Sequence, residues 1–186
     1  MGRWKPDARG RLAQAALELF VERGYESTTV ADIAARAGVT ERTFFRHFAD
    51  KREVLFGDPV EYNGVFTDAV AAAPADASPL DAAALALRAA GKWFEGRHPY
   101  ARRRAAVIAA HPALQEREQV KRLHLTEAIA AALVARGTGE AAAALTAELT
   151  SVAFHQAFTR WVTADEESDL GDLAVGVLDE LRALAC

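Results

Sequence analysis

The sequence predicts an all-α protein of about nine helices, with a small N-terminal helical domain followed by a longer helical bundle. Hydrophobic residues make up 51% of the 186 residues. Much of that fraction is Ala and Leu, which favour helices, and runs of β-branched residues are few. Apolar side chains also recur at helical spacing between breaks made by Gly and Pro. Together these features favour helices throughout the chain.

The first predicted helix runs from Asp7 to Arg23. Pro6 precedes it, Asp7 can cap it, and Gly24 can end it. Its apolar positions recur at helical spacing, at Leu12, Ala16, Leu19 and Phe20.

Two short helices then follow the pattern of a helix-turn-helix motif. Hydroxyl side chains at 27–29 can cap a helix over residues 30–37, which Gly38 ends. Thr40 can cap the next helix, over residues 41–48. A short helix, a glycine at the turn and a capped second helix are typical of the motif.

The second helix of this motif has distinct inward and outward sides. At about 100° per residue, Phe44 and Phe48 share the inward side. Arginine can pair with guanine, and threonine can meet a phosphate or a thymine methyl group. An ordinary amphipathic surface helix would also carry outward arginines, so this helix alone leaves both interpretations open. The outward and flanking positions are Arg42, Thr43, Phe45, Arg46 and His47.

These residues resemble the DNA-binding domain of TetR-family repressors. The resemblance covers residues 11–56, with A-x-x-L-F at 16–20, G-Y at 24–25, T-x-x-D-I-A-x-x-A-G-V at 29–39 and F-F-R-H-F-x-x-K at 44–51. Family members often carry Tyr where Phe45 stands. Phe45 cannot donate a hydrogen bond to a phosphate, a loss of about 1 kcal/mol. The resemblance implies contacts to double-stranded DNA from Thr28, Thr29, Thr40, Arg42, Thr43, Phe45, Arg46, His47 and Lys51.

The distribution of charge agrees with a DNA-binding N-terminus. Residues 1–56 carry ten Lys and Arg against eight Asp and Glu, and the rest of the chain carries twelve against eighteen. A small basic surplus at one end fits local contact with DNA better than a uniformly acidic chain would.

Other classes of protein are disfavoured by what the sequence lacks. No apolar run approaches the roughly 20 residues of a membrane span, and the N-terminus lacks the apolar core of a signal peptide. Its one cysteine, Cys186, allows no intrachain disulfide, which fits a reducing compartment. Metal-ligand spacings, Gly-rich phosphate loops and the G-x-S-x-G motif are absent. We therefore expect a cytoplasmic protein with no membrane partner, metal, cofactor or enzymatic activity.

We expect a DNA-binding domain over residues 1–50 and an effector-binding and dimerisation domain over 51–186. A fourth helix should begin at 51–56, break at Gly57-Asp58-Pro59 and resume over 60–73. The sequence leaves open whether this break is a hinge or a plain loop.

Five further helices are expected, over residues 79–95, 99–110, 112–136, 140–164 and 169–185. The last two have apolar faces wider than one core needs, which predicts a homodimer joined by a two-fold four-helix bundle. A thicker monomer core is the alternative. The apolar stripes include Leu145, Leu149, Val152 and Trp161 in one helix, and Leu170, Leu173, Val177, Leu178, Leu181 and Leu184 in the other.

The resemblance also implies an apolar cavity for a small-molecule effector within the C-terminal bundle. The run H-P-A-L-Q-E-R at 111–117 is similar to a branch of the family that includes responders to acyl ligands. The histidines of this region are equally explained as exposed or capping residues. The candidate lining residues are Trp93, Phe94, His124, Phe154, His155 and Phe158.

These features predict a ligand-responsive transcriptional regulator that binds a palindromic operator as a dimer. A repressor released by its effector is the simplest form. Two alternatives stay open: an activator, and a small-molecule sensor whose helix-turn-helix motif no longer binds DNA. Phe45 and the modest basic surplus keep the second alternative open.

Overall fold

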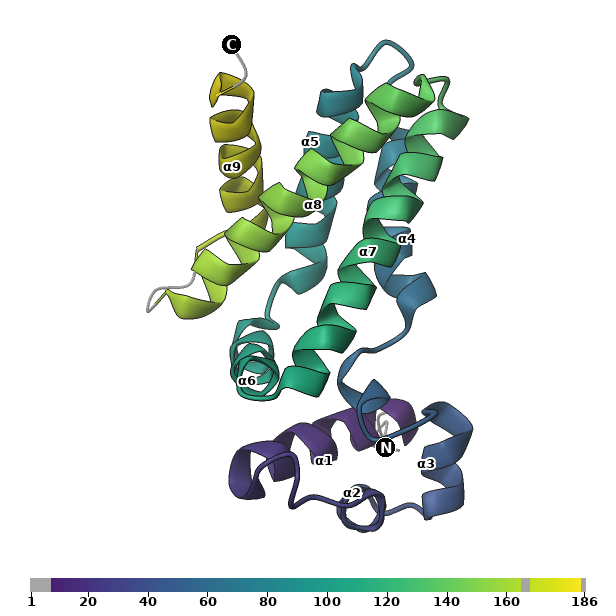
Figure 1. The fold of residues 1–186 in the computed structure, drawn as a ribbon, viewed down its shortest axis with the longest axis vertical. Coiled ribbons are helices and arrows are strands. Elements are labelled where there is room, and N and C mark those ends of the chain that lie inside the picture. Colours follow the sequence, from purple (N-terminus) through teal and green to yellow (C-terminus); the bar gives the residue numbers. More distant parts are fainter. Residues whose placement is uncertain (1–7, 165–167, 185–186) are drawn as a thin grey trace, which may run out of the picture. The chain divides into compact units, whose positions relative to one another are not determined.

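The computed structural model describes residues 8–164 and 168–184. Across these ranges the regular elements are nine α-helices and one 3-10 helix. The α-helices are labelled in Figure 1. The predicted all-α fold is therefore confirmed. The predicted start of the first helix at Asp7 and the terminal Cys186 lie outside the described residues.

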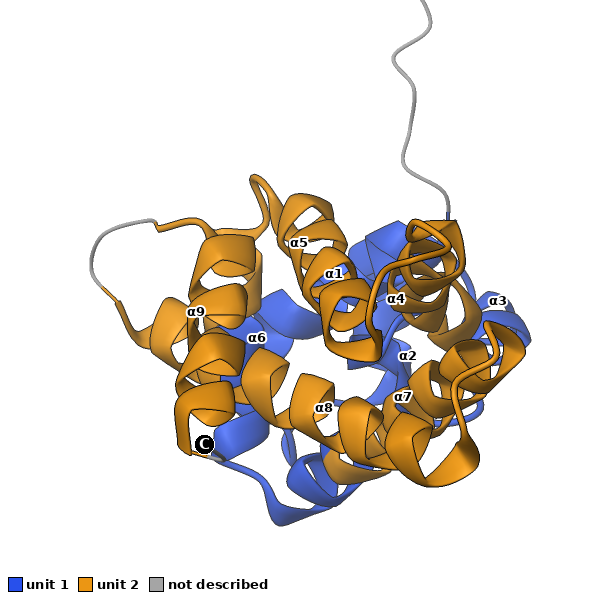
Figure 2. Ribbon diagram, turned by 90° about the horizontal axis from the view of Figure 1, so that it is seen from above, with its two compact units in different colours: residues 1–57, 103–118 blue, residues 58–102, 119–186 orange. Residues whose placement is uncertain are grey.

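The chain folds into two compact units (Figure 2). Unit 1 holds the described residues up to Gly57 together with Arg103–Glu118, and unit 2 holds Asp58–Arg102 and the described residues from Gln119 onward. Helices α6 (His98–Ala109) and α7 (Pro112–Ala135) thus each contribute to both units. The predicted functional division between residues 50 and 51 stays a prediction.

Unit 1 contains three short α-helices and a 3-10 turn, namely α1 (Ala8–Arg23), α2 (Val30–Ala37), α3 (Glu41–His47) and η1 (Glu53–Leu55). The apolar positions expected for α1 are all buried, which confirms its inward face. The core of the unit includes Leu12, Ala16, Leu19, Phe20, Ile33, Ala34, Phe44, Val54 and Leu55.

Local capping determines where α2 begins and ends. The Thr29 hydroxyl accepts a hydrogen bond from Asp32 N at 3.1 Å, and Asp32 Oδ2 accepts one from Thr29 N at 3.0 Å. This capping box satisfies amide groups that the first turn leaves without helical partners. At the other end Gly38 has φ 68°, a left-handed conformation that glycine adopts without strain. The chain therefore turns sharply between α2 and α3.

Two predicted boundaries in unit 1 differ from the structure. Helix α3 ends at His47, and Phe48 is extended with φ −137° and ψ 136°, yet its side chain is buried. Only the 3-10 turn η1 forms where a fourth helix was expected to begin. Its amides are partly satisfied by the Asp50 carboxylate instead, which accepts a hydrogen bond from Glu53 N at 3.2 Å. The predicted break is confirmed, because Gly57 has φ 62°.

Unit 2 contains α4 (Pro59–Ala72), α5 (Pro79–Phe94), α8 (Glu140–Thr163), α9 (Leu170–Leu184) and most of α7. Helix α5 packs against α4, α8 and α9, and α8 also packs against α9. The five helices predicted after residue 78 all form, with ends within one residue of expectation. None of the described helices is long and apolar enough to cross a membrane.

Glycines allow α5 and α9 to cross closely. A Cβ atom added at Gly91 would lie 2.3 Å from the backbone nitrogen of Gly171. A Cβ at Gly171 would lie 3.2 Å from the Cα atom of Arg88. No larger residue fits at Gly91 without moving one of the two helices.

The apolar stripe predicted on α9 is shared between the monomer core and the surface. Leu170, Val177 and Leu178 are buried within the chain, whereas Leu184 is exposed. On α8 the predicted stripe also divides, because Trp161 is buried while Leu145 and Val152 stay exposed. Part of the predicted dimer seam thus already serves the monomer.

Candidate DNA-binding site

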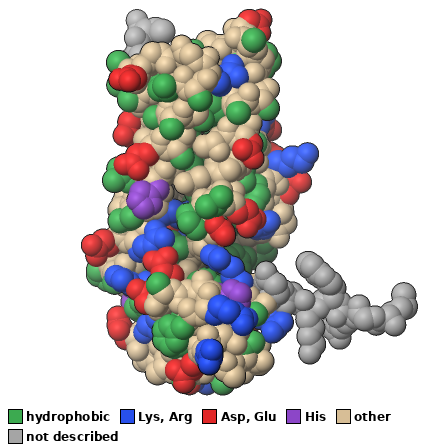
Figure 3. Space-filling model, turned by 90° about the vertical axis from the view of Figure 1, so that its right-hand side faces the viewer, with side chains coloured by type: hydrophobic (Ala, Val, Ile, Leu, Met, Phe, Trp, Pro, Cys, Tyr) green, Lys and Arg blue, Asp and Glu red, His purple; other side chains and the backbone are tan. Residues whose placement is uncertain are grey.

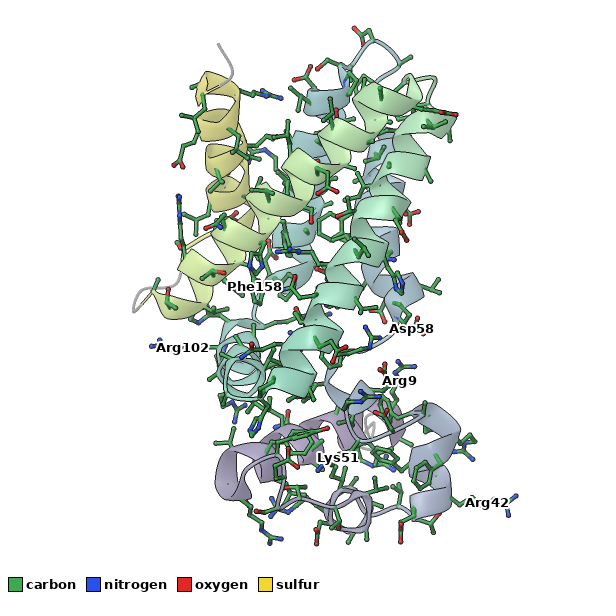
Figure 4. All side chains as sticks on the ribbon, viewed as in Figure 1. Arg9, Arg42, Lys51, Asp58, Arg102 and Phe158 are labelled. Carbon is green, nitrogen blue, oxygen red and sulfur yellow. The ribbon has the colours of Figure 1, made fainter. Side chains whose placement is uncertain are left out.

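Helix α3 turns one face inward and leaves the other in solvent. Phe44 is fully buried, whereas Phe45 is 55% exposed. Arg42 and Arg46 are exposed and Thr43 is half-buried. Figure 4 shows Arg42 projecting away from the helix. Four of the residues predicted to contact DNA therefore share one accessible surface of unit 1, which we call the α3 face: Arg42, Thr43, Phe45 and Arg46.

The two arginines of the α3 face are not held by acidic side chains. In the described ranges, neither Arg42 nor Arg46 forms a side-chain hydrogen bond or an ion pair. Arg36 on α2 differs, because its guanidinium donates to both carboxylate oxygens of Glu22, at 3.1 and 2.9 Å. Figure 3 shows Lys and Arg side chains gathered beside a His on the surface of unit 1. Guanidinium groups without an acid partner can meet phosphate or guanine.

Thr29 and Thr40 both serve as helix caps and lie exposed. Thr40 Oγ1 accepts a hydrogen bond from Thr43 N at 3.2 Å and shares another with Thr43 Oγ1 at 3.1 Å. Thr29 Oγ1 donates to Asp32 Oδ2 at 2.6 Å. That bond is the main reason why the pKa of the Asp32 carboxyl is lowered. These hydroxyl groups determine where α2 and α3 begin.

Thr28 and Lys51 are turned into unit 1. Thr28 is 1% exposed, and its hydroxyl donates to the Gly24 carbonyl at 2.8 Å. Lys51 Nζ donates to the Tyr25 and Thr28 carbonyls at 2.8 and 3.0 Å and lies 4.1 Å from the Tyr25 ring centroid. Figure 4 shows Lys51 within the unit. This placement favours a bracing role for both residues, and their phosphate contacts stay predictions.

His47 lies at the edge of the α3 face and is half-buried. Its ring stands 6.4 Å from the Phe48 ring, centroid to centroid. Its Nε2 atom is buried and has no hydrogen-bond partner among the described residues. The expected phosphate contact of His47 stays a prediction.

A second set of charged residues in unit 1 surrounds Phe56 and was not predicted from the sequence. The guanidinium carbons of Arg104 and Arg117 lie 5.1 and 4.9 Å from the Phe56 ring centroid. Arg117 donates to both oxygens of Glu53, at 2.6 and 2.9 Å, and Arg104 donates to Glu118 at 2.6 Å. We call these residues, Phe56, Arg104, Arg117, Glu53 and Glu118, the Phe56 cage.

The three consecutive arginines of α6, Arg102–Arg104, differ in their exposure. Arg102 and Arg103 are exposed, but Arg104 is buried, and its Nε atom donates to the Leu55 carbonyl at 2.7 Å. The hydrogen bond with Glu53 is the largest cause of the raised pKa of Arg117. Only contacts between distant parts of the chain distinguish Arg104 from its neighbours, so helical spacing could not identify it.

In unit 2, four of the six residues proposed for the effector cavity lie together. The Phe94 ring is 6.1 Å from Phe154 and 5.4 Å from Phe158, centroid to centroid. Trp93 meets Phe94 at 4.8 Å. His124 is exposed, and no ring contact joins it to these residues in the part of the chain described. His155 is half-buried on α8.

The aromatic cluster is larger than the sequence suggested. Phe66 on α4 meets Phe154 on α8 at 5.1 Å, centroid to centroid, although the two are 88 residues apart in the sequence. Tyr62 on α4 meets Trp93 on α5 at 6.0 Å. Helical spacing does not show which helices pack together, so it did not link these rings. The full aromatic cluster consists of Tyr62, Phe66, Trp93, Phe94, His98, Phe154, Phe158 and Trp161. Such a cluster offers apolar and aromatic surface to a ligand.

The described residues hold no group of three or more His, Cys, Asp or Glu side chains that could bind a metal ion. The groups suited to binding are the α3 face in unit 1 and the aromatic cluster in unit 2.

The capped helix pair and its exposed second helix define a protein of the helix-turn-helix class. Residues 12–56 match the family described as bacterial regulatory proteins, tetR family. Residues 77–185 match the family described as the MftR C-terminal domain. The chain belongs to the TetR family of bacterial regulatory proteins, and its second domain is of the MftR type.

Individual relatives agree with this assignment. The transcriptional regulator TcmR of Streptomyces glaucescens is 46% identical over 81 residues, which cover 44% of this chain and 36% of that protein. The chain thus matches about a third of the length of this curated relative.

Two solved structures share the fold over nearly the whole chain. FadR of Bacillus subtilis in complex with stearoyl-CoA has a TM-score of 0.62 and 21% identity, covering 92% of this chain and 96% of that one. FadR of Thermus thermophilus, a repressor in complex with lauroyl-CoA, has a TM-score of 0.59 and 22% identity. The match covers 94% of this chain and 93% of that one.

Proposed function

We propose that this protein is a ligand-responsive transcriptional repressor that acts in the cytoplasm on a palindromic operator. The observation that carries the proposal is the α3 face, where exposed Arg42 and Arg46 have no acidic partner in the described ranges. The buried Phe44 side chain anchors the helix beneath them. A short helix held in this way can enter a major groove and present guanidinium groups to guanine.

The DNA contacts are proposed to divide into two kinds. Arg42, Thr43, Phe45 and Arg46 meet base edges or the groove, and Phe45 packs against a thymine methyl group or a sugar. Thr29, Thr40 and His47 border that surface and contact phosphate. Thr28 and Lys51 act mainly by holding the loop before α2 in place, through the carbonyls of Gly24, Tyr25 and Thr28.

We propose that two copies of the chain associate through α8 and α9. Leu145 is 68% exposed, and Val152, seven residues further along the same stripe of α8, is also exposed. Burying apolar area at about 25 cal/mol per Å² favours covering these side chains with a partner. A two-fold dimer would present two α3 faces to one side of a duplex, about one helical turn apart.

We propose an acyl-CoA as the effector class. Two FadR proteins of the same fold are complexes with stearoyl-CoA and lauroyl-CoA. The aromatic cluster supplies apolar surface for an acyl chain. Within it Trp93, Phe94 and Phe158 are half-buried, so part of each side chain is accessible to solvent. Release of DNA requires the ligand to prefer one state of the protein over the other.

The DNA-binding proposal can be tested by selection from a random duplex library followed by titration of the enriched sequence. We expect a palindromic site, and we expect Arg42→Ala to lose about 1–3 kcal/mol of binding free energy. Arg88→Ala, which removes an exposed arginine of unit 2, is the matched control and should bind as tightly as the parent. If Arg42→Ala also bound like the parent, the α3 face would be the wrong surface.

The effector proposal can be tested with lauroyl-CoA. We expect it to raise the melting temperature of the protein and to dissociate the complex with the enriched DNA. We expect Phe158→Asp to remove the thermal shift, because a carboxylate in the cluster opposes an acyl chain. A parent protein that bound the DNA equally well with and without lauroyl-CoA would exclude this ligand as the effector.

A further inference from the structure

The Phe56 cage joins parts of unit 1 that lie far apart in the sequence. Glu53 and Phe56 come from η1 and the residue after it, whereas Arg104 comes from the middle of α6 and Arg117 from the second turn of α7. Helix α6 begins in unit 2, and α7 continues into unit 2. The cage therefore holds two helices that do not belong wholly to the DNA-binding unit.

The charged side chains of the cage are each held by particular partners. Arg104 is 9% exposed, and its guanidinium group contacts the Leu55 carbonyl, Glu118 and the Phe56 ring. Arg117 is half-buried and forms a two-point pair with Glu53. A largely buried cation is tolerated only with its partners in place. Both guanidinium groups keep these partners only while residues 53–56 and 103–118 stay docked, and Arg117 Nη1 is buried without a hydrogen-bond partner among the described residues.

Contacts beyond the cage extend the same attachment. The His111 ring lies 5.2 Å from the Tyr25 ring, centroid to centroid, and Leu114 is fully buried. Tyr25 in turn accepts a hydrogen bond from Lys51 through its carbonyl group. The corner between α6 and α7 therefore supports the loop that precedes the helix-turn-helix motif, as well as η1.

We propose that Arg104, Arg117 and Glu53 are positioning residues for DNA reading. Through the Phe56 cage, residues 103–118 form one cooperative body with α1 and η1. The first turns of α7 therefore unfold locally together with the DNA-binding unit, and not together with the remainder of α7. None of the three residues touches DNA. Only the DNA-reading part of this inference rests on the proposed function.

Amide hydrogen exchange on the full-length protein tests the cooperative body without any ligand. In Arg117→Gln we expect exchange to accelerate about tenfold or more, in step across α1, η1 and the start of α7. Amides of α5 and α8 should exchange as in the parent. Arg88→Gln, which removes an exposed pair with Asp172 in unit 2, should leave the exchange of unit 1 unchanged. If residues 113–118 accelerated alone, or exchanged with the rest of α7 in the parent, the inference would be overturned.

Where Arg117→Gln fails to fold, Arg117→Lys decides the same question. Lysine keeps the charge but cannot form the two-point pair with Glu53. We expect a smaller acceleration with the same distribution over α1, η1 and the start of α7. Faster amide exchange in residues 113–118 alone would contradict the cooperative body, as it would for Arg117→Gln.

Titration of the enriched DNA at several salt concentrations tests the positioning role. We expect Arg117→Gln to lower the affinity about tenfold without changing the slope of log K against log salt, since no phosphate contact is lost. Arg46→Gln, which removes a cation from the α3 face itself, should lower the affinity and calibrates the measurement. Unchanged affinity, or a changed slope, in Arg117→Gln would contradict positioning. A parent without a specific complex would refute the proposed function, and hydrogen exchange would still decide the cooperative body.

Discussion

Residues next to the α3 face serve the fold and the proposed contact with DNA at the same time. Thr40 caps α3 through its hydroxyl group, which accepts from Thr43 N, and it is also exposed where a phosphate is expected. An alanine substitution would affect both roles at once, because loss of a cap costs about 1 kcal/mol. Aspartate separates them, since it caps a helix well but carries a negative charge.

We predict that Thr40→Asp leaves the melting temperature near that of the parent and weakens DNA binding more than tenfold. Repulsion between the new carboxylate and the phosphates is the cause. Ser78→Asp in unit 2 is the control for the added charge and should leave the DNA affinity unchanged. Its carboxylate would face Asp81, whose Oδ2 atom lies 2.6 Å from the Ser78 hydroxyl, so a lower melting temperature is expected for this control alone. Melting curves and fluorescence anisotropy measure the two effects, and undiminished DNA affinity in Thr40→Asp would remove residue 40 from the interface.

Asp50 links the stability of unit 1 to pH. Its carboxylate accepts hydrogen bonds from Arg52, at 3.1 and 2.8 Å from the guanidinium and 2.7 Å from the amide. The side-chain hydrogen bond with Arg52 is the main cause of its lowered pKa. The unfolded chain therefore takes up this proton at a higher pH than the folded chain. The stabilisation is complete above the unfolded pKa of about 4 and is lost as the pH falls through the folded value.

We predict that Asp50→Asn flattens the decline in the free energy of unfolding between about pH 5 and pH 2. Urea unfolding of both proteins across this range measures the difference. Other lowered carboxylates, such as Asp81, remain in the variant, so part of the decline should persist. Identical pH dependence in the two proteins would show that Asp50 does not contribute.

At the scale of elements, the crossing of α5 and α9 depends on residues without side chains. Gly91→Ala would place a methyl carbon 2.3 Å from Gly171 N, a distance at which backbone must move. We predict a loss of about 1–3 kcal/mol in the free energy of unfolding. Gly64→Ala on α4 is the control, because its Cβ would meet only Asp68 Oδ2 at 3.8 Å. It should stabilise by about 0.5–1 kcal/mol. Equal effects in urea unfolding would contradict this account.

Elements whose residues contact near neighbours were predicted well from the sequence. The side chains of Phe44 and Phe48 are inward as expected, and Thr29 and Thr40 cap the predicted helices. Helical period and capping chemistry are local, so the sequence expresses them directly. The failed start of a fourth helix at residues 51–56 has a different cause, because Asp50 and Gly57 favour a short 3-10 turn that a helical pattern does not show.

For the whole molecule, association through α8 has a direct test. We predict that Leu145→Glu shifts the protein from dimer to monomer, because a carboxylate would be buried without a partner. Val60→Glu is the control, since Val60 is exposed on α4 and outside the proposed interface. Sedimentation equilibrium measures the mass of each. A Leu145→Glu protein that remained dimeric would place the interface elsewhere.

The attachments between distant parts of the chain were not predictable. Residues 103–118 belong to the same compact unit as the helix-turn-helix motif, although more than 40 residues separate them from Gly57. Nothing in the local pattern around Arg104 distinguishes it from Arg103, yet one is buried and the other exposed. The aromatic cluster shows the same limit, because Phe66 joins Phe154 only through the fold. Spacing identifies a helix face, but it does not identify what that face contacts.

The central claim, that unit 1 reads DNA through the α3 face, is tested most directly by the salt dependence of binding. Fluorescence anisotropy compares the parent protein on the enriched palindrome and on a scrambled duplex between about 50 and 200 mM salt. We predict tighter binding to the palindrome at every concentration, by about a thousandfold or more, with affinity falling steeply as salt rises. Equal affinity for the two duplexes, or no complex with either, would contradict the claim and favour a sensor that does not read DNA.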